Sequence, residues 1–542
     1  MKIVGFHSGH DSSYAVLDNG LPKVHIELER YSRRKNAIED SISYFNKLDP
    51  DAEDVTYMTT HRGGGFRAFN FMNSYNNLES NIKSKNGHSY ITGHHQAHAS
   101  NAFYTSNFKE ALIITIDGGG RDYIDGRAHS KSNFDEPDSE CITTCTTVWQ
   151  GKDNKITPIE FIPSSKWNVG FYWANTTSKV FGLGTYKDVR GDQAGTVMGM
   201  AALGDPQKYL KYFKNIHDLT QHKNWGPIDY DFLREEANKS EQNAFDIAAS
   251  LQYETEILLK DLLNKYIKEY NPKNICFSGG VALNCVALGK IFKWFPGINI
   301  FCDPIPYDGG LSLGSARYVW HHILDNPRIY DKPQNQTPYL GYNYSKKEIE
   351  DSLKTVRDKI NIEYKEDEFV IDELINKKIV SLFGGPSESG RRALGNRSII
   401  ADPRYKETKD IVNEKVKHRQ WFRPFAPSIL KDDVKEWFEY DIDSPYMNFA
   451  IPFKKEKLLE VPAVTHFDGT ARLQTVSKNL NTWYYNFISK FKEKTGVPIL
   501  LNTSFNDREP IVETPKHAVD CFLKTNIDYL YFRDHNILIS KK

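Results

Sequence analysis

The sequence predicts an α/β protein of two domains that holds a nucleotide at the ends of its strands. β-rich apolar runs alternate with segments of helical spacing, and glycine turns that contain Asp or Ser follow strands or loops at 117–120, 278–280 and 308–310. Such turns ahead of helices are typical of nucleotide-binding α/β folds. A stretch rich in Pro, Asn and Gln at 325–338 divides the 542 residues, a length that allows more than one domain.

The first part of the chain opens with a predicted antiparallel meander. Apolar runs at 3–7, 14–17 and 23–28 have the composition of strands. Asn19 and Gly20 stand between the second and third runs, and Asn-Gly is a strong hairpin signal because both residues tolerate positive φ. The sequence therefore predicts a tight turn at this point.

A second group of elements surrounds the glycine turns. Residues 111–116 form an apolar run that we expect to be a buried strand, which ends at Asp117 and delivers its carboxylate to the edge of a sheet. Another strand is predicted at 274–277. Apolar residues recur at helical spacing, which predicts helices at 245–268, 281–292 and 311–323.

The rest of the chain predicts a second domain of mixed strands and helices. Strands are expected at 379–383 and 497–501, the first ending in Gly-Gly-Pro and the second in Asn-Thr-Ser. With the linker at 325–338, the expected domains are 1–338 and 339–542.

Composition excludes several classes of protein. The chain has 70 Lys and Arg against 70 Asp and Glu, so no overall charge attracts nucleic acid or an anionic membrane. The apolar runs are far shorter than the roughly 20 residues that span a bilayer. The N-terminus turns polar before a signal-peptide core can form, and the six scattered cysteines fit reduced thiols. We therefore expect a cytoplasmic protein with no membrane partner.

His94 opens the sequence His-His-Gln-Ala-His, the sharpest single motif. On a helix His94 and His98 share a face and can bind one metal, whereas His95 points elsewhere; a polar helix surface is the alternative. No Glu follows His94, which argues against a metalloprotease. Asp117 and Asp308 can supply oxygen ligands, and such a set suits iron(II) or manganese better than structural zinc.

Two further residues near the first turn and third strand have catalytic potential. His10 can act as a base near neutral pH, and Lys35 can hold an anionic or carbonyl oxygen. Taken alone, a turn histidine and a solvated basic run are the plainer interpretations. The nearby glycine turns favour the catalytic one.

Arginines in the predicted second domain stand next to glycine and proline turns. Arg392, Arg423 and Arg472 come from separate segments with apolar surroundings. Guanidinium groups make two-point contacts with phosphate oxygens, so their convergence predicts a triphosphate pocket rather than scattered surface ion pairs. The chain has no Walker A sequence.

Together these motifs resemble those of the NodU/CmcH family of O-carbamoyltransferases, in the family's order over nearly the whole chain. One departure is Glu-Ser-Gly-Arg-Arg, where the family has Glu-Trp-Gly-Pro-Arg; it keeps Arg392 in register and changes the pocket wall at Ser389 and Arg391. The matching segments are 9–13, 29–35, 94–99, 116–119, 197–200, 278–284, 308–310, 392–398, 422–427, 466–472 and 501–506.

The resemblance implies an N-terminal domain with the duplicated actin/sugar-kinase fold, similar to tRNA threonylcarbamoyl transferases, and an α+β YrdC-like C-terminal domain. It implies that the C-terminal domain converts carbamoyl phosphate and magnesium-bound ATP to carbamoyl-adenylate and pyrophosphate. The N-terminal domain would then transfer the carbamoyl group to an acceptor hydroxyl.

The resemblance also implies the site residues. They are His10, Lys35 and Asp117 for catalysis; Arg392, Arg423, Arg472, Asn502 and Ser504 for the nucleotide and carbamoyl phosphate; Gly118, Gly119, Gly279, Gly280 and Asn284 for carbamoyl-adenylate; and His94, His98, Asp117 and Asp308 for iron(II), with manganese as the alternative.

Several alternatives stay open. The chain could be a tRNA threonylcarbamoyl transferase-like enzyme or a non-catalytic nucleotide-binding regulator. The expected acceptor is a sugar or another natural product, and hydroxymethylated cytosine in DNA is the alternative. Basic and aromatic segments at 30–35, 61–67 and 415–423 would be the surface that meets DNA. A homodimer is a further expectation.

Overall fold

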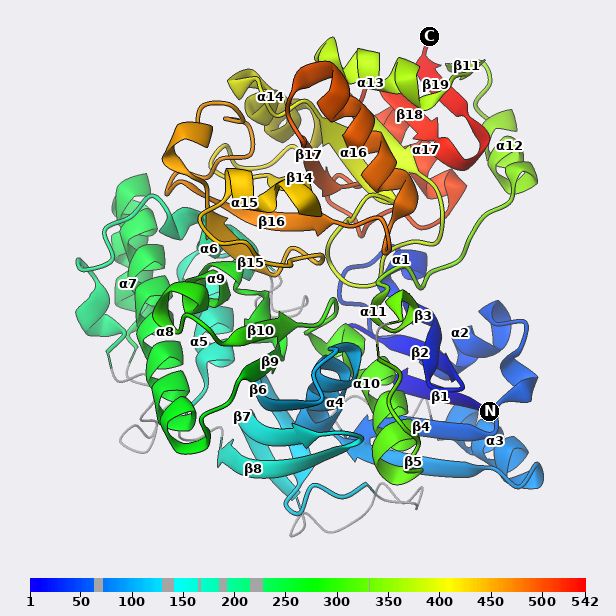
Figure 1. Ribbon diagram of the computed structural model, residues 1–542, viewed down its shortest axis with the longest axis vertical. Helices are drawn as coiled ribbons and strands as arrows, with labels where there is room; N and C mark the ends of the chain where they lie inside the picture. Colours follow the sequence, from blue (N-terminus) through cyan, green and yellow to red (C-terminus); the bar gives the residue numbers. More distant parts are fainter. Residues whose placement is uncertain (63–71, 129–140, 164–166, 185–192, 215–227, 331) are drawn as a thin grey trace. The chain divides into compact units, whose positions relative to one another are not determined.

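A computed structural model gives the structure of the chain and describes residues 1–62, 72–128, 141–163, 167–184, 193–214, 228–330 and 332–542 (Figure 1). The chain forms two compact units. The first spans 1–287 and 291–336, and the second spans 288–290 and 337–542. Each unit is described by itself.

The first sheet of the first unit begins with a hairpin meander. Its strands are β1 (Lys2–His7), β2 (Ser13–Asp18), β3 (Leu21–Glu27), β4 (Tyr57–Arg62) and β5 (His88–Gly93). They lie in the order β3-β2-β1-β4-β5, with β1 to β3 antiparallel and β4 and β5 parallel to β1. Asn19 and Gly20 have φ of 48° and 81°, which confirms the predicted turn.

The second sheet repeats this connectivity. Its strands are β6 (Glu110–Tyr123), β7 (Cys141–Lys152), β8 (Lys155–Pro163), β9 (Asn274–Ser278) and β10 (Asn299–Cys302). Among the described strands the order is β10-β9-β6-β7-β8, with β6 to β8 antiparallel and β9 and β10 parallel to the first of them. Two sheets with one strand order confirm the predicted duplicated α/β fold.

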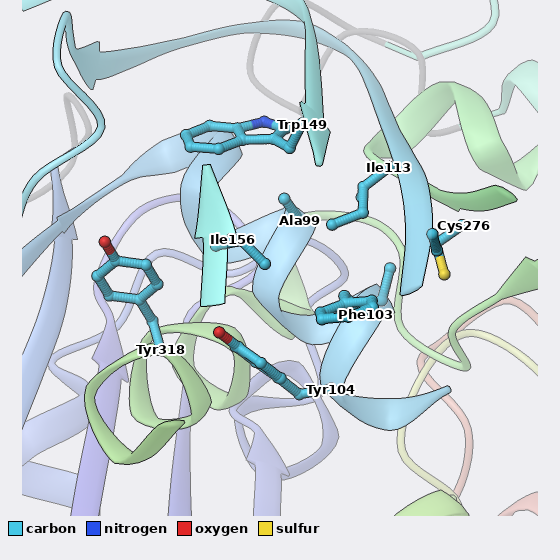
Figure 2. Close-up of a cluster of buried hydrophobic side chains, with 10 residues drawn as sticks. Ala99, Phe103, Tyr104, Ile113, Trp149, Ile156, Cys276 and Tyr318 are labelled. Atoms are coloured by element: carbon cyan, nitrogen blue, oxygen red, sulfur yellow. The ribbon is translucent and has the colours of Figure 1, made fainter. Parts of the chain in front are cut away.

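Two buried helices pack between these sheets. Helix α10 (Leu311–Tyr318) packs on β1, β2 and β4, α4 (His94–Thr105) packs on β6 and β9, and the two helices contact each other. A Cβ on Gly314 would lie 2.0 Å from the Ala97 carbonyl oxygen, so only glycine allows this approach. Figure 2 shows an apolar cluster in which residues of α4 pack with Ile113, Trp149, Tyr318 of α10 and others.

The predicted strand end at Asp117 is wrong. Strand β6 continues to Tyr123, and its pairing with β7 is irregular between Ile116 and Gly120. Glycines inside a strand mark bulges, because they accept the backbone angles that an interrupted ladder requires. Asp117 therefore leaves the sheet at a bulge rather than at a terminus.

The helix predictions hold with changes at their ends. Helix α8 (Glu241–Tyr270) contains the whole predicted segment 245–268. The segment 281–292 is divided into a 3-10 turn (Gly280–Leu283) and α9 (Cys285–Trp294), because Asn284 caps α9 by accepting from the Ala287 amide. The remaining helices of the unit are α1 (Glu29–Ser32), α2 (Ser41–Leu48), α3 (Met72–Ser84), α5 (Val169–Asn175), α6 (Ala194–Ala201), α7 (Tyr230–Lys239) and α11 (Pro333–Gln336).

The segment predicted as a linker is partly ordered structure of the first unit. It contains α11, and the buried Asn335 side chain accepts a hydrogen bond of 2.7 Å from the Arg317 guanidinium. A hydrogen-bonded, buried side chain fixes the chain here, which composition alone does not reveal.

The second unit is an α+β structure on one mixed sheet in the order β11-β19-β18-β12-β13-β17-β14-β16-β15. Helix α16 packs on β14 and β17, and α17 packs on β12 and β18. The strands are β11 (Ile360–Tyr364), β12 (Val380–Phe383), β13 (Arg397–Ala401), β14 (Ala426–Leu430), β15 (Phe449–Pro452), β16 (Thr470–Val476), β17 (Ile499–Ser504), β18 (Tyr529–Phe532) and β19 (Ile537–Lys541); the helices are α12 (Lys346–Lys354), α13 (Asp367–Ile375), α14 (Lys406–Ile411), α15 (Val434–Trp437), α16 (Thr482–Thr495) and α17 (Pro515–Lys524).

One prediction for this unit is corrected. Asn502 and Ser504 do not follow the strand at 497–501 but belong to β17, where each pairs with β13. Pairing with β13 on one side and β14 on the other extends the strand through polar residues that look like a turn in the sequence. In the described parts of the chain, no helix is both long and apolar enough to cross a membrane.

Candidate functional site

Helix α4 carries two histidines on one face at its buried beginning. The side chain of Gln96 caps the helix by accepting from the Gly93 amide at 2.9 Å. His94 and His98 lie one turn apart with ring centroids 4.9 Å from each other, and both are buried. The predicted shared face is therefore present.

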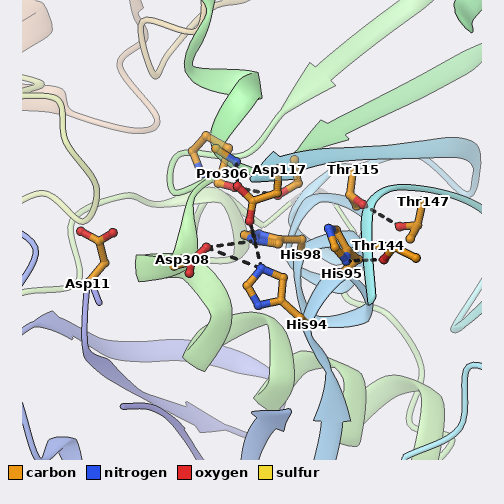
Figure 3. Close-up of polar contacts among 12 residues, drawn as sticks. Asp11, His94, His95, His98, Thr115, Asp117, Thr144, Thr147, Pro306 and Asp308 are labelled. Carbon is orange, nitrogen blue, oxygen red and sulfur yellow. Dashed lines mark hydrogen bonds and ion pairs between the residues drawn. The ribbon is translucent and has the colours of Figure 1, made fainter. Parts of the chain in front are cut away.

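Two carboxylates meet these rings (Figure 3). Asp117 comes from the bulge in β6, and Asp308 opens the 3-10 turn Asp308–Gly310 ahead of α10. His94 Nε2 lies 2.9 Å from Asp117 Oδ2 and 3.6 Å from Asp308 Oδ1, and His98 Nε2 lies 3.5 Å from both oxygens. One ligand atom from each of the four side chains lies within 4.8 Å of the others.

The donor set of this His/Asp cluster fits a divalent cation. With both imidazoles neutral, as metal binding requires, the four side chains have a net charge of −2, and the buried His98 Nε2 lies 3.5 Å from one carboxylate oxygen of each Asp. Burial lowers the pKa of His98, but contact with Asp117 and Asp308 outweighs it and raises the pKa to about 10. The cluster therefore favours a positive charge at its centre, and imidazole with carboxylate suits iron(II) or manganese.

His95 points away from the cluster, as its spacing predicts. Its Nδ1 lies 2.7 Å from Asp122 Oδ2 and 3.0 Å from the Thr144 hydroxyl (Figure 3). Asp122 also accepts from the Gln96 amide at 3.0 Å, so it holds the first turn of α4. No local sequence pattern indicates this role of Asp122, because Asp122 follows α4 by many residues and meets it only through the fold.

His10 lies at the open side of the cluster. Its Nε2 is 3.2 Å from Asp308 Oδ2 and its Nδ1 is 3.0 Å from Asp11 Oδ2, while 46% of the side chain is exposed. Burial of the ring opposes protonation, but Asp308 and Asp11 raise the pKa of His10 to about 10. The structure thus brings His10 to the predicted metal ligands, whereas Lys35 is an exposed residue between α1 and α2.

The second glycine turn lies against Asp117. The Gly280 amide donates to Asp117 Oδ1 at 3.0 Å, and a Cβ on Gly279 would lie 2.2 Å from the Ile116 carbonyl oxygen. Gly118 and Gly119 form the bulge itself, and a Cβ on Gly118 would meet open space. These glycines leave backbone amides and space beside the carboxylate.

Asn284 is engaged elsewhere. Its Oδ1 caps α9, and its Nδ2 donates to Gln252 Oε1 at 2.9 Å. The side chain therefore fixes the helix that follows the glycine turn.

In the second unit, three arginines lie close enough for their charges to interact. Arg419 donates from Nε to Asn413 Oδ1 at 2.7 Å and from a terminal nitrogen to the Pro424 carbonyl, both neutral oxygens. Burial, together with the charges of Arg423 and Arg472, holds the pKa of Arg419 well below its usual value. Such a guanidinium cluster attracts an anion. Arg419 is the member that the arginine pattern did not single out.

Two other residues predicted to bind the nucleotide, Asn502 and Ser504, lie on β17 of the sheet in this unit. Asn502 Nδ2 donates to the Ala393 carbonyl at 3.1 Å, so the loop that carries Arg392 is held against β17. Ser504 donates to Asn506 Oδ1 at 2.8 Å, and its carbonyl accepts from Lys417 Nζ at 2.7 Å. Lys417, which belongs to the predicted basic segment 415–423, is a buried ammonium group.

The predicted basic surface is corrected in part. Arg30, Lys417 and Arg419 are not solvated surface: the first two side chains are buried, and burial depresses the pKa of the third. Arg30 instead lies 3.7 Å from Glu27. Lys417 donates to Ser504 and Asn506, which lie far along the chain, and a local charge run does not show such contacts. Residues 63–67 of the segment 61–67 lie outside the described residues.

Two family models match the chain. The model described as Carbamoyltransferase N-terminus matches residues 74–317, which include the His/Asp cluster. The model described as Carbamoyltransferase C-terminus matches residues 371–541, which include the three arginines.

Known proteins are similar over most of this chain. It is 34% identical over 497 residues to the uncharacterized protein sll1178 of Synechocystis sp., covering 83% of this chain and 75% of that protein. It is 34% identical to nodulation protein NolO of Bradyrhizobium diazoefficiens, covering 81% and 77% of the two chains. It is 32% identical to the uncharacterized protein MJ1051 of Methanocaldococcus jannaschii, covering 99% of each. The two matching halves and these relatives show that the chain belongs to the carbamoyltransferase family and is a carbamoyltransferase.

Proposed function

We propose that the chain is an ATP-dependent O-carbamoyltransferase that works in two steps. In the first step, water cleaves carbamoyl phosphate to carbamate and phosphate, and a carbamate oxygen attacks the α-phosphorus of ATP. Carbamoyl-adenylate forms and pyrophosphate leaves. In the second step, an acceptor hydroxyl attacks the carbamoyl carbon, AMP leaves with the bonding electrons, and the hydroxyl proton passes to a base.

The arginine cluster of the second unit supports the first step. Both substrates are phosphate anions, and Arg419, Arg423 and Arg472 offer forked donors whose own charges repel one another. A bound phosphate relieves that repulsion and is held in a fixed orientation. Lys417 is a further buried cation of this unit, and it donates to Ser504 at the end of β17 and to Asn506 just beyond it.

The His/Asp cluster of the first unit supports the second step. His10 is the proposed base, because its side chain is partly exposed and Asp11 orients its Nδ1. Burial lowers the pKa of His10 but Asp308 raises it, and a cation bound at the cluster would offset that charge and so let Nε2 accept a proton. A divalent cation held by His94, His98, Asp117 and Asp308 would polarise the carbamoyl or phosphate oxygen and offset the charge of Asp308. The Gly279 and Gly280 backbone beside Asp117 receives the adenylate, and Lys35 holds the mixed anhydride.

The observation that carries this proposal is the buried His/Asp cluster with His10 at its open side, in a chain whose family transfers carbamoyl groups. His10→Asn should abolish carbamoyl transfer and leave carbamoyl phosphate-dependent pyrophosphate release intact, because only the second step needs the base. Pyrophosphate is measured with a coupled assay, and carbamoylated acceptor by its mass gain. Loss of both carbamoyl transfer and pyrophosphate release would contradict the assignment of His10 to the second step alone.

The acceptor is identified by a panel of hydroxylated compounds. Sugars and other natural products are the expected class, and DNA that contains hydroxymethylated cytosine is the alternative arm. Mass spectrometry detects the carbamoyl product in every arm. If DNA is the acceptor, binding should weaken steeply with salt, because phosphate contacts release counterions. Pyrophosphate exchange with carbamoyl phosphate separates an enzyme of this kind from a nucleotide-binding regulator.

A further inference from the structure

One buried carboxylate lies where three elements of the His/Asp cluster meet. Asp303 directly follows β10 and is fully buried, with 0% of its surface exposed. Its Oδ1 accepts from Asn101 Nδ2 at 2.9 Å and from the Ile305 amide at 2.8 Å, and its Oδ2 accepts from the Ser278 hydroxyl at 2.9 Å. Three donors from three segments therefore converge on one side chain.

Each of these three donors leads to a different part of the cluster. Asn101 stands on α4 three residues after His98, on the same side of the helix. The Ile305 amide fixes the segment that leads to Asp308. Ser278 ends β9 ahead of the glycine turn whose Gly280 amide donates to Asp117 at 3.0 Å.

We propose that Asp303 is a positioning residue that sets the spacing of all four ligand side chains, through Asn101 to the α4 histidines, through Ile305 to Asp308 and through Ser278 to Asp117. This inference rests on the proposed metal site. Asp303 is not one of the four ligand residues, and its role is to fix the segments that carry them.

The packing around Asp303 leaves little freedom to compensate for its loss. A Cβ on Gly310 would lie 2.2 Å from the Ile305 carbonyl oxygen and 3.0 Å from Asn101 Nδ2. A Cβ on Gly314 would lie 3.2 Å from Asn101 Cβ. Because helix α4 and the loop are already in contact at glycines, removing the shared acceptor leaves buried donors unpaired and shifts segments rather than a single side chain.

Binding of Mn(II) to the full-length chain tests this inference without reference to turnover. Asp303→Ala should weaken Mn(II) binding at least 10-fold, as loss of groups that orient metal ligands commonly does, and should change the electron paramagnetic resonance spectrum of the bound ion. Asp303→Asn should restore affinity to within about threefold of wild type, since its oxygen can still accept from Asn101 and Ile305 while its amide faces the Ser278 hydroxyl.

The control is Ser89→Ala, which removes a buried hydroxyl of β5 that donates to Glu79 of α3 at 2.6 Å, a hydrogen bond that involves none of the four ligand residues. It should leave Mn(II) affinity unchanged. If Asp303→Ala fails to fold, Asn101→Ala and Ser278→Ala replace it, and each should weaken Mn(II) binding severalfold. A folded Asp303→Ala with wild-type affinity, or an Asp303→Asn as weak as Asp303→Ala, overturns the inference.

Failure of the proposed metal site gives a different result. In that case the wild-type chain binds neither Mn(II) nor Fe(II), whatever residue stands at position 303. Wild-type binding that also survives Asp303→Ala, Asn101→Ala and Ser278→Ala contradicts the positioning role alone.

Discussion

Arg419 and Arg404 show how surroundings decide what a single arginine does. Arg404 makes contacts of 2.6 to 3.0 Å with both carboxylate oxygens of Asp402, whose hydrogen bonds raise the pKa of the guanidinium. Arg419 meets neutral oxygens and two further arginines, and its pKa is depressed. The first arginine is already paired with a carboxylate of the protein, whereas the second belongs to the group that we propose binds a phosphate.

Replacing an arginine of the cluster should therefore affect substrate binding. We expect Arg472→Ala to raise the KM for carbamoyl phosphate or ATP about 10- to 100-fold, because charge-assisted hydrogen bonds contribute about 1.5–3 kcal/mol. The measurement is pyrophosphate release at varied substrate concentration. Arg404→Ala is the matched control and should leave both KM values unchanged; equal effects of the two substitutions would refute the anion site.

At the scale of elements, contacts between glycine and backbone fix the helix that carries the histidines. Helix α10 approaches α4 at Gly314 and approaches β1 at Gly5, where a Cβ would lie 1.9 Å from the Ser312 carbonyl oxygen. Backbone atoms cannot move aside as side chains do. The position of His94 and His98 therefore depends on residues with no chemistry of their own.

Gly314→Ala should destabilise the first unit and weaken Mn(II) binding. Overpacking a buried contact typically costs about 1–3 kcal/mol, and here the obstacle is the Ala97 carbonyl oxygen at 2.0 Å. Thermal unfolding and metal titration check both effects. Gly195→Ala on α6, where a Cβ meets nothing among the described residues within 4 Å, is the control and should preserve stability. If Gly314→Ala left stability as unchanged as Gly195→Ala does, helices α4 and α10 would be able to move apart without cost.

His321, in the helical turn after α10, makes the free energy of unfolding of the first unit depend on pH. His321 is buried and packs against Tyr104 with ring centroids 4.5 Å apart. Its pKa is about 3, lowered by burial and by Arg317 and Arg328. The unfolded chain, with the ordinary value of 6.5, takes up the proton first. The free energy of unfolding therefore falls as pH drops below about 6.5.

His321→Phe should remove this pH-dependent contribution to stability and keep an aromatic ring packed against Tyr104. Below pH 6.5 its stability should fall less steeply than that of wild type, by up to about 1.4 kcal/mol per pH unit. Chemical denaturation from pH 8 to pH 4 measures both curves, and the value at pH 8 records the separate cost of the lost bond to Asn326. Parallel curves would mean that His321 does not titrate on unfolding.

At the scale of the whole molecule, the two proposed steps belong to two compact units. The His/Asp cluster lies wholly in the first and the arginine cluster wholly in the second. A ligand stabilises the folded form of the unit that binds it, by about 2.7 kcal/mol when the free ligand concentration is 100 times the dissociation constant. Metal and phosphate should therefore protect different parts of the chain.

Hydrogen exchange can resolve the two effects. Mn(II) should slow exchange in α4, β6 and α10 and leave β14, β16 and β17 unchanged, and carbamoyl phosphate should do the reverse. Asp308→Asn should abolish the Mn(II) effect and retain the response to carbamoyl phosphate. Uniform protection of both units by Mn(II) would contradict separate sites.

The sequence by itself determined the local features of this protein. The Asn19-Gly20 turn, the strands of the opening meander, the helix at 245–268 and the shared face of His94 and His98 all follow from spacing and from backbone preferences within a few residues. The ordered motifs also indicated the family, because each motif is a short contiguous segment. These properties depend on neighbours along the chain, which the sequence displays directly.

Only the tertiary structure decided which distant residues meet and which charges are buried. It extended β6 through the glycines at 118–120, covered Arg30 and Lys417, and engaged Asn284 in a helix cap. It also brought Asp303 to the junction of three segments. Burial and hydrogen-bond partners depend on atoms that come from anywhere in the chain, so the environment of a charged group is a property of the packed molecule and not of its sequence neighbours.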